Sequence, residues 1–252
     1  MAHRTSAGHC CLAHVSTGGA RAGIAVWALL AAGVTRFLPA PIGEPAAAGN
    51  ENAGPGAWRH GGARPSYLIS VGLGVGEGGL VAALPALLVA LGRQPGAAGL
   101  LAAVLAAASA VGGLALSRLQ ARLPGTPTIQ SACALILMSA VLLITALGPN
   151  VGFVVVGLVG GGLFIAPVNA LRARALEQAL PSRMRSEGYS IQYGANGLGV
   201  AAGSGLIAAL VNMSPRIAIT SALAVGAAAG VVAALLHRCG GGGVPRGDRN
   251  LV

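Results

Sequence analysis

The sequence predicts an all-α membrane protein, a six-transmembrane-helix bundle. Of the 252 residues, 54% are hydrophobic and only 9% are charged, whereas a soluble domain carries roughly 25% charged residues. Aromatic residues make up 3% of the chain and Gly occurs 41 times. Frequent glycine suits helices that pack closely in lipid better than a soluble core filled with large side chains.

Six stretches are long enough to cross a bilayer. A hydrocarbon core about 30 Å thick needs roughly 20 apolar residues of helix, because unpaired backbone amides are too costly in lipid. Five of the stretches contain no charged residue, and the first contains one, Glu77. The predicted spans are Tyr67 to Leu91, Ala97 to Leu116, Ile129 to Leu147, Val151 to Leu171, Tyr189 to Val211 and Ile217 to Leu236.

Arginine placement predicts the orientation of these spans. All the basic residues are Arg, and the loops between the spans alternate between short and long. One side receives only Arg93 and Arg216, and the other receives Arg59, Arg64, Arg118, Arg122, Arg172, Arg174, Arg183, Arg185, Arg238, Arg246 and Arg249. By the positive-inside rule, both ends of the block lie in the cytoplasm of a multi-pass cell-membrane protein.

Three regions follow from this pattern. Residues 1–65 are expected to form a disordered or interfacial head, residues 66–238 the membrane domain and residues 239–252 a flexible cytoplasmic tail. The apolar stretch from Gly23 to Val34 has the length of a signal-peptide core and is short for a span. A crossing or a cleavage there would place Arg59 and Arg64 outside, against the charge bias of the later loops.

A dinucleotide fingerprint is formally present but lacks its context. The segment GVGEGG places glycines at Gly74, Gly76 and Gly79 after an apolar stretch. The fingerprint also needs an acidic residue about 20 positions later to bind the ribose. After Glu77 the next acidic residue is Glu177, so close packing of membrane helices explains these glycines better.

Other functional classes find little support in the sequence. The net charge of +10 comes from small groups of arginines between apolar runs, without aromatics to stack bases, so no nucleic-acid partner is expected. No catalytic constellation is found in the membrane block, and an intramembrane enzyme is a distant third interpretation. No cofactor and no metal are expected, because the head's cluster of His3, His9, Cys10, Cys11 and His14 matches no established metal spacing.

Polar residues inside the spans are the candidates for a transport pathway. Glu77 is costly in the middle of a span and normally faces a cavity or a partner. It fits a proton site, a contact to a cationic substrate, or a protonated carboxyl bonded to a neighbouring helix. Asn169 lies beside Pro167 in the fourth span, and Gln192 and Asn196 share one face of the fifth. These three residues are either pathway or structural groups.

Two segments resemble the C-terminal half of the major facilitator superfamily. The second span ends GGLALSRLQARLPG, in which Gly113, Ser117, Arg118 and Arg122 are similar to a degenerate copy of the family's cytoplasmic loop motif. Ser117 stands where the motif has an acid, and Gln120 where a second Gly is usual. The segment from Ala166 to Val211 resembles the tenth and eleventh helices of many bacterial facilitators. The composition, rich in Ala, Gly and Arg, suggests a GC-rich bacterial source.

The resemblance implies transport of a small molecule by alternating access, with proton-coupled efflux as the expected mode. Full facilitators enclose a midplane site between two six-helix halves. This sequence shows one half, so the resemblance implies a partner, either a second copy or a separate N-terminal half. The alternative is a transport-inactive half-transporter fragment or a membrane interaction partner.

Overall fold

The computed structural model describes residues 56–119 and 124–240, and six long α-helices account for most of these residues. They are α2 (Arg64–Ala90), α3 (Ala98–Leu119), α4 (Pro127–Leu147), α5 (Val151–Ala179), α6 (Arg185–Leu210) and α7 (Pro215–Gly240). Three short 3-10 helices precede α2, α3 and α6, namely η1 (Ala57–Arg59), η2 (Pro95–Ala97) and η4 (Ser182–Met184). The six predicted spans correspond one to one with the six α-helices.

Local sequence signals set several helix ends. Thr126 and Asn150 act as N-caps, since their side chains accept hydrogen bonds from the amides of Ile129 and Phe153. After α2 the chain turns at Gly92, whose φ of 69° is a left-handed conformation suited to glycine. The amide of Arg93 donates to the carbonyl of Leu88 at 2.8 Å, which completes a Schellman-type helix end.

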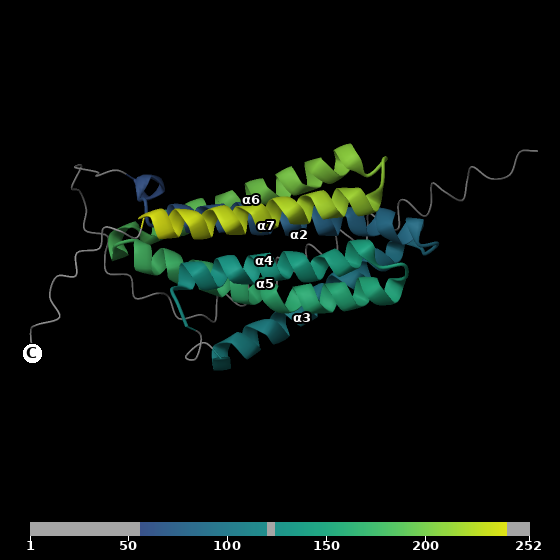
Figure 1. Cartoon of the computed structure of the whole chain (residues 1–252), viewed down its shortest axis with the longest axis horizontal. Coiled ribbons are helices and arrows are strands. Elements are labelled where there is room, and N and C mark those ends of the chain that lie inside the picture. The colour runs from purple at the N-terminus through teal and green to yellow at the C-terminus, as the bar shows by residue number, and fades with distance from the viewer. Residues whose placement is uncertain (1–55, 120–123, 241–252) are drawn as a thin grey trace, which may run out of the picture. The chain divides into compact units, whose positions relative to one another are not determined.

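The helices pack in two groups, as Figure 1 shows, with α2, α6 and α7 in one and α3, α4 and α5 in the other. The most extensive contacts join α2 to α6 and α7, α5 to α3 and α4, and α4 to α7 across the two groups. Exchanging α2 with α5, α3 with α6 and α4 with α7 maps this contact set onto itself. Two three-helix units of inverted orientation, as found in many transporters, produce this pattern.

Glycines set the close approach of α2 to its neighbours. A Cβ built on Gly74 would lie 2.2 Å from the carbonyl oxygen of Asn196, and one on Gly78 would lie 2.5 Å from that of Val200. The reciprocal positions on α6, Gly199 and Gly203, meet the backbone of α2 in the same way. We call these four glycines the glycine interface. The prediction that the GVGEGG glycines serve close helix packing is confirmed for Gly74 and Gly79, whereas a Cβ on Gly76 would meet its neighbours only at ordinary contact distances.

The opposite face of α2 uses glycine against α7. A Cβ on Gly72 would lie 2.6 Å from the Cβ of Ala229, and one on Gly79 would lie 2.6 Å from that of Ala222. On the other side of the bundle, Gly157 meets Thr145 of α4 at a similarly close distance. Small residues therefore mark the helix contacts on both sides of the bundle, as expected where lipid replaces water.

Five of the six long helices in the described residues are long and apolar enough to cross a membrane by themselves. The exception is α6, whose first half carries Ser190, Gln192, Tyr193 and Asn196. Its length matches that of the other helices, so its polarity is the reason for the difference. Gln192 is buried and Asn196 is hydrogen bonded to α5, so packing satisfies polar groups that lipid could not.

The two ends of the bundle differ in charge. The starts of α2, α4 and α6 and the ends of α3, α5 and α7 lie at one end, which we call the arginine-rich end. Among the described residues, this end carries Arg59, Arg64, Arg118, Arg174, Arg183, Arg185 and Arg238, and the opposite end carries Arg93 and Arg216. Arg216 donates a hydrogen bond of 3.3 Å to the carbonyl of Gly148 there.

The last residues before α2 pack against the bundle. Ala57 and Ala63 are fully buried and share a small apolar cluster with Leu176 and Leu180. The amide of Ala57 donates to the Glu187 carboxylate at 3.1 Å. The rest of the predicted head, with its His and Cys cluster, and the predicted tail beyond residue 240 lie outside the described residues.

Candidate functional site

A buried polar junction joins α2, α5 and α6 in the half of the bundle near the arginine-rich end. The Ser66 hydroxyl donates to the backbone carbonyl of Arg172 at 2.8 Å. The Gln192 amide donates to the Ser66 hydroxyl at 2.7 Å and to the same carbonyl at 3.2 Å. The Arg172 guanidinium donates to the Asn196 side-chain oxygen at 3.3 Å. We call these four residues the polar junction.

Arg172 is the unusual member of the polar junction, because its side chain is only 3% exposed. A guanidinium has five N–H donors and cannot be deprotonated in a protein. Burying it is costly unless an opposite charge or several acceptors compensate for the lost water. Within the part of the chain that the structure describes, its hydrogen bond goes to the neutral amide of Asn196.

Glu77 is the acidic residue that acts electrostatically on Arg172. It is partly buried in α2, one turn beyond Gly74, which packs on the backbone of Asn196. The carboxyl of Glu77 and the guanidinium of Arg172 interact electrostatically. The structure therefore brings together Gln192 and Asn196 of the predicted pathway residues around an arginine from α5. In the described residues Glu77 makes no hydrogen bond or ion pair with this group and acts on Arg172 through its electrostatic field alone.

Asn169 does not join this group through any contact the structure gives. Its amide donates to the carbonyl of Ile165 in its own helix at 3.0 Å, one turn before it. Pro167 lies between the two residues inside α5. Because proline removes a backbone N–H and disturbs the helix around it, this bond supplies a partner to a carbonyl close to the disturbed turn.

The loop motif lies at the arginine-rich end of α3. Gly113 packs on Ala166 of α5, because a Cβ added to Gly113 would lie 3.2 Å from the Cβ of Ala166. Ser117 donates to the carbonyl of Leu114 within its own helix at 2.7 Å, and Ser117 and Arg118 are exposed. Arg122 lies outside the described residues, so the structure gives no partner for the complete motif.

Arg172 is the residue that the sequence analysis missed. The prediction that Arg172 lies in the loop after the fourth span is wrong, because α5 continues to Ala179. The apolar run ends at Leu171, but the helical pattern does not. Val168, Leu171, Arg172, Ala175 and Leu176 are all buried, at the three- and four-residue spacings of one helix face. That periodicity was the available signal.

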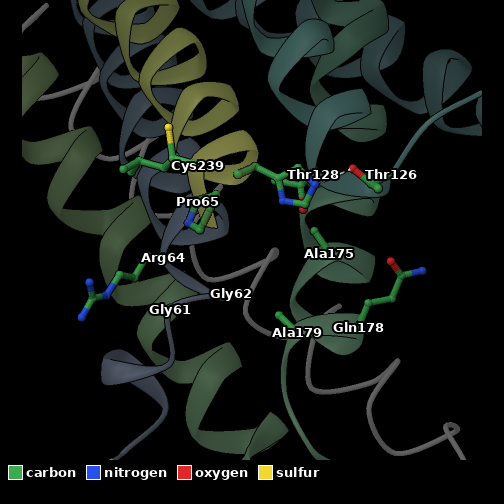
Figure 2. A pocket seen from close by; sticks show the side chains of 12 residues that line it. Gly61, Gly62, Arg64, Pro65, Thr126, Thr128, Ala175, Gln178, Ala179 and Cys239 are labelled. Carbon is green, nitrogen blue, oxygen red and sulfur yellow. Dashed lines mark hydrogen bonds between the residues drawn. The ribbon is translucent and has the colours of Figure 1, made fainter. Parts of the chain in front are cut away.

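A separate cavity of about 590 Å³ opens at the arginine-rich end. Figure 2 shows it between the starts of α2 and α4 and the ends of α5 and α7, with the Arg64 side chain extending away from Thr126 and Thr128. The Thr126 hydroxyl and Nε2 of His237 form a hydrogen bond of 3.0 Å across it. None of the predicted pathway residues lines this cavity, so it is distinct from the polar junction.

These features define a polytopic helical membrane protein with a buried charged group shared by three helices. A family model described as Major Facilitator Superfamily matches residues 66–245. The chain belongs to the major facilitator superfamily, as its loop motif and helix pattern indicated, and it is a membrane transport protein of this family. Members of the family are transporters and not enzymes. No curated protein and no solved structure matches the chain.

Proposed function

We propose that the chain transports a small molecule by alternating access, with Glu77 as its proton site. The observation that carries this proposal is the buried Arg172, bonded to Asn196 and electrostatically coupled to Glu77. Ionisable groups inside a membrane are costly and commonly form substrate pathways or proton relays. A proton that binds Glu77 removes the charge that compensates Arg172, and so links protonation to the contacts between α2, α5 and α6.

The glycine interface supports a moving role for these helices. Gly74 and Gly78 meet α6 through backbone atoms, so the two helix backbones lie in direct contact at these positions. Alternating access requires bundles to rock against one another around a fixed site. Pro85 and Pro167 lie inside α2 and α5, where such residues permit local bending. We expect α2 and α5 to change their contacts with α6 during transport.

The test measures proton flux in vesicles that contain the purified full chain and a pH-sensitive dye. Candidate substrates of different charge are added one at a time, and substrate-dependent proton movement is recorded. Glu77→Gln keeps the size of the side chain and removes its charge. We expect it to reduce the substrate-dependent proton flux at least tenfold, because the variant has lost its proton-transfer group. Glu177→Gln, an exposed carboxyl on α5, is the matched control. Wild-type proton flux in Glu77→Gln vesicles would overturn the proposal.

We propose that the arginine-rich end faces the cytoplasm and that transport runs outward. Seven of the arginines in the described residues lie at this end and two at the other, which matches the positive-inside rule. A single cysteine introduced at Gly61 should be labelled by membrane-impermeant reagents only after cells are opened, once the four native cysteines, Cys10, Cys11, Cys133 and Cys239, are replaced. Labelling in intact cells would reverse the orientation. Export from preloaded cells tests the direction.

We also propose that the bundle pairs with a second six-helix unit, either another copy or a separate N-terminal half. On α6, Leu198 is 73% exposed and Tyr193 is 68% exposed, next to the helix face that carries Asn196. A pathway lined by one bundle alone would be open to lipid on this side. Cross-linking of a cysteine at Leu198 in cells, followed by mass measurement, distinguishes the two partners. A monomer that transports unaided would exclude both, and a monomer without transport would favour the inactive fragment.

A further inference from the structure

We propose that Arg172 and Asn196 bind the anionic group of the transported molecule, best a carboxylate, in exchange with the carboxylate of Glu77. This inference rests on the proposed function and names its substrate class. The geometry is that of a guanidinium held at 3.3 Å from an amide oxygen, beside a helix face where Gly74 brings the backbone of α2 onto Asn196.

Charge balance favours an anion over a cation at this place. With Glu77 ionised and Arg172 charged, the pair is neutral. When a proton binds Glu77, the positive charge of Arg172 remains uncompensated in a low-dielectric site, which is costly. A bound anion restores neutrality. A cation beside Glu77 would instead face the positive charge of Arg172.

The chemistry of the donors favours a carboxylate. Arginine presents a rigid fork of N–H donors that matches the two oxygens of a carboxylate. In the described part of the chain one Arg172 nitrogen bonds to Asn196, and Asn196 retains an amide N–H₂ group that can donate to the same anion. The Arg172 backbone carbonyl is occupied by Ser66 and Gln192, which fixes the position from which the side chain extends.

The remaining neighbours leave Glu77 as the group that would compete with the anion. Arg172 is the charged residue that acts on Glu77, and Tyr193 of α6 acts on Arg172. The other titratable residues of α2 and the helices packed on it are Arg64 and Tyr67 in the first turn of α2, Arg118 near the end of α3, Cys133 in α4, Arg174 and Glu177 beyond Arg172 in α5, Arg185, Glu187 and Tyr189 in the first turns of α6, and Arg216, His237, Arg238 and Cys239 near the ends of α7.

The loaded and empty forms of the site are then both neutral. The loaded site holds a protonated Glu77, Arg172 and the anion, and the empty site holds ionised Glu77 and Arg172. Each transport cycle moves one proton together with one anion, without net charge. The direction follows the sum of the two gradients, so an anion that accumulates in the cell drives its own export.

The test measures anion binding to the purified full chain as a shift of its thermal unfolding midpoint, because a ligand of the folded state stabilises it. The probes are sodium lactate, sodium benzoate and inorganic phosphate, with tetraethylammonium as the cation, at constant ionic strength. Binding of lactate or benzoate should be tighter at mildly acidic than at mildly alkaline pH. Preference for phosphate over both carboxylates would overturn the assignment to a carboxylate.

Variants separate anion binding from a structural role. Glu77→Gln removes the competing charge, so its carboxylate affinity should rise by about tenfold, within the usual range of coupling between sites, and lose its pH dependence. Arg172→Met should lose the shift at every pH, and Arg172→Lys should retain a weaker one. Arg174→Met, at an exposed arginine on the same helix, should match the wild type. If Arg172→Met does not fold, the Lys and Gln variants decide.

The outcomes distinguish this inference from the proposed function. If tetraethylammonium drives proton flux that depends on Glu77, and no anion shifts unfolding, the proton site stands and the anion site is wrong. Unchanged carboxylate affinity in Glu77→Gln also overturns the exchange. If neither charge class moves protons through the wild-type protein, the proposed function itself fails.

Discussion

Helices α2 and α3 have similar hydropathy and opposite surroundings. In the most apolar stretch of α2, 61% of the residues are buried inside the bundle, against 28% for α3. Contacts on both faces hold α2, with α6 on one and α7 on the other, whereas α3 packs mainly on α5. Since lipid tails are as apolar as leucine, hydropathy does not separate a central helix from a peripheral one. The number of packed faces does separate them, because α2 has close-packed glycines toward both α6 and α7, whereas those of α3, Gly112 and Gly113, meet α5 alone.

The largest effect is expected from closing the glycine interface. Gly78→Val places a branched side chain where even a Cβ would lie 2.5 Å from the Val200 carbonyl oxygen. Overpacking of this kind should cost about 3 kcal/mol or more. The measurement is the free energy of unfolding in bicelles by steric trapping.

Gly197→Val is the matched control for that change. Gly197 lies on α6, and nothing approaches within 4 Å of a Cβ built there. Its unfolding free energy should stay within about 0.5 kcal/mol of wild type. Because valine has a higher helix propensity than glycine, a loss cannot come from propensity. Equal losses in the two variants would therefore show that contact between α2 and α6 does not set the effect.

A smaller difference is expected from the same leucine truncation in the two helices. Leu73 of α2 is fully buried, and Leu114 of α3 is 70% exposed. Leu73→Ala leaves a packing defect and should cost about 1–2 kcal/mol, less than in a soluble core because no transfer from water is lost. Leu114→Ala should stay within about 0.5 kcal/mol of wild type. A large loss for Leu114→Ala would reveal a protein partner on α3.

The smallest difference concerns one hydroxyl group in each helix. Ser66 of α2 joins Arg172 and Gln192, whereas Ser117 of α3 bonds within its own helix. Ser66→Ala should cost about 0.6–1.7 kcal/mol, the range for buried bonds between membrane helices. Because Gln192 keeps its bond to the Arg172 carbonyl, we expect the lower part of that range. Ser117→Ala should leave the free energy of unfolding almost unchanged. A larger loss for Ser117→Ala than for Ser66→Ala would contradict the comparison of the two helices.

The sequence predicted the helices and their packing residues better than it predicted the site. Apolar length located the spans, and the glycines of GVGEGG were expected to pack closely. Arg172 was missed because a charge that follows an apolar run resembles the start of a loop. Its burial depends on contacts with Ser66, Gln192 and Asn196. These residues belong to other helices and lie 20 or more positions away in the sequence. Such tertiary contacts leave no local signal beyond the helical period.

The polarity of α6 has a consequence for biosynthesis. A segment that lacks the hydropathy of an independent span partitions poorly from the translocon into lipid. Its partner α2 emerges more than a hundred residues earlier, as the separation of 126 residues between Ser66 and Gln192 shows. The ribosome therefore delivers the docking surface first. Weakening the glycine interface should expose α6 to quality-control proteolysis during synthesis, before any loss of transport is visible.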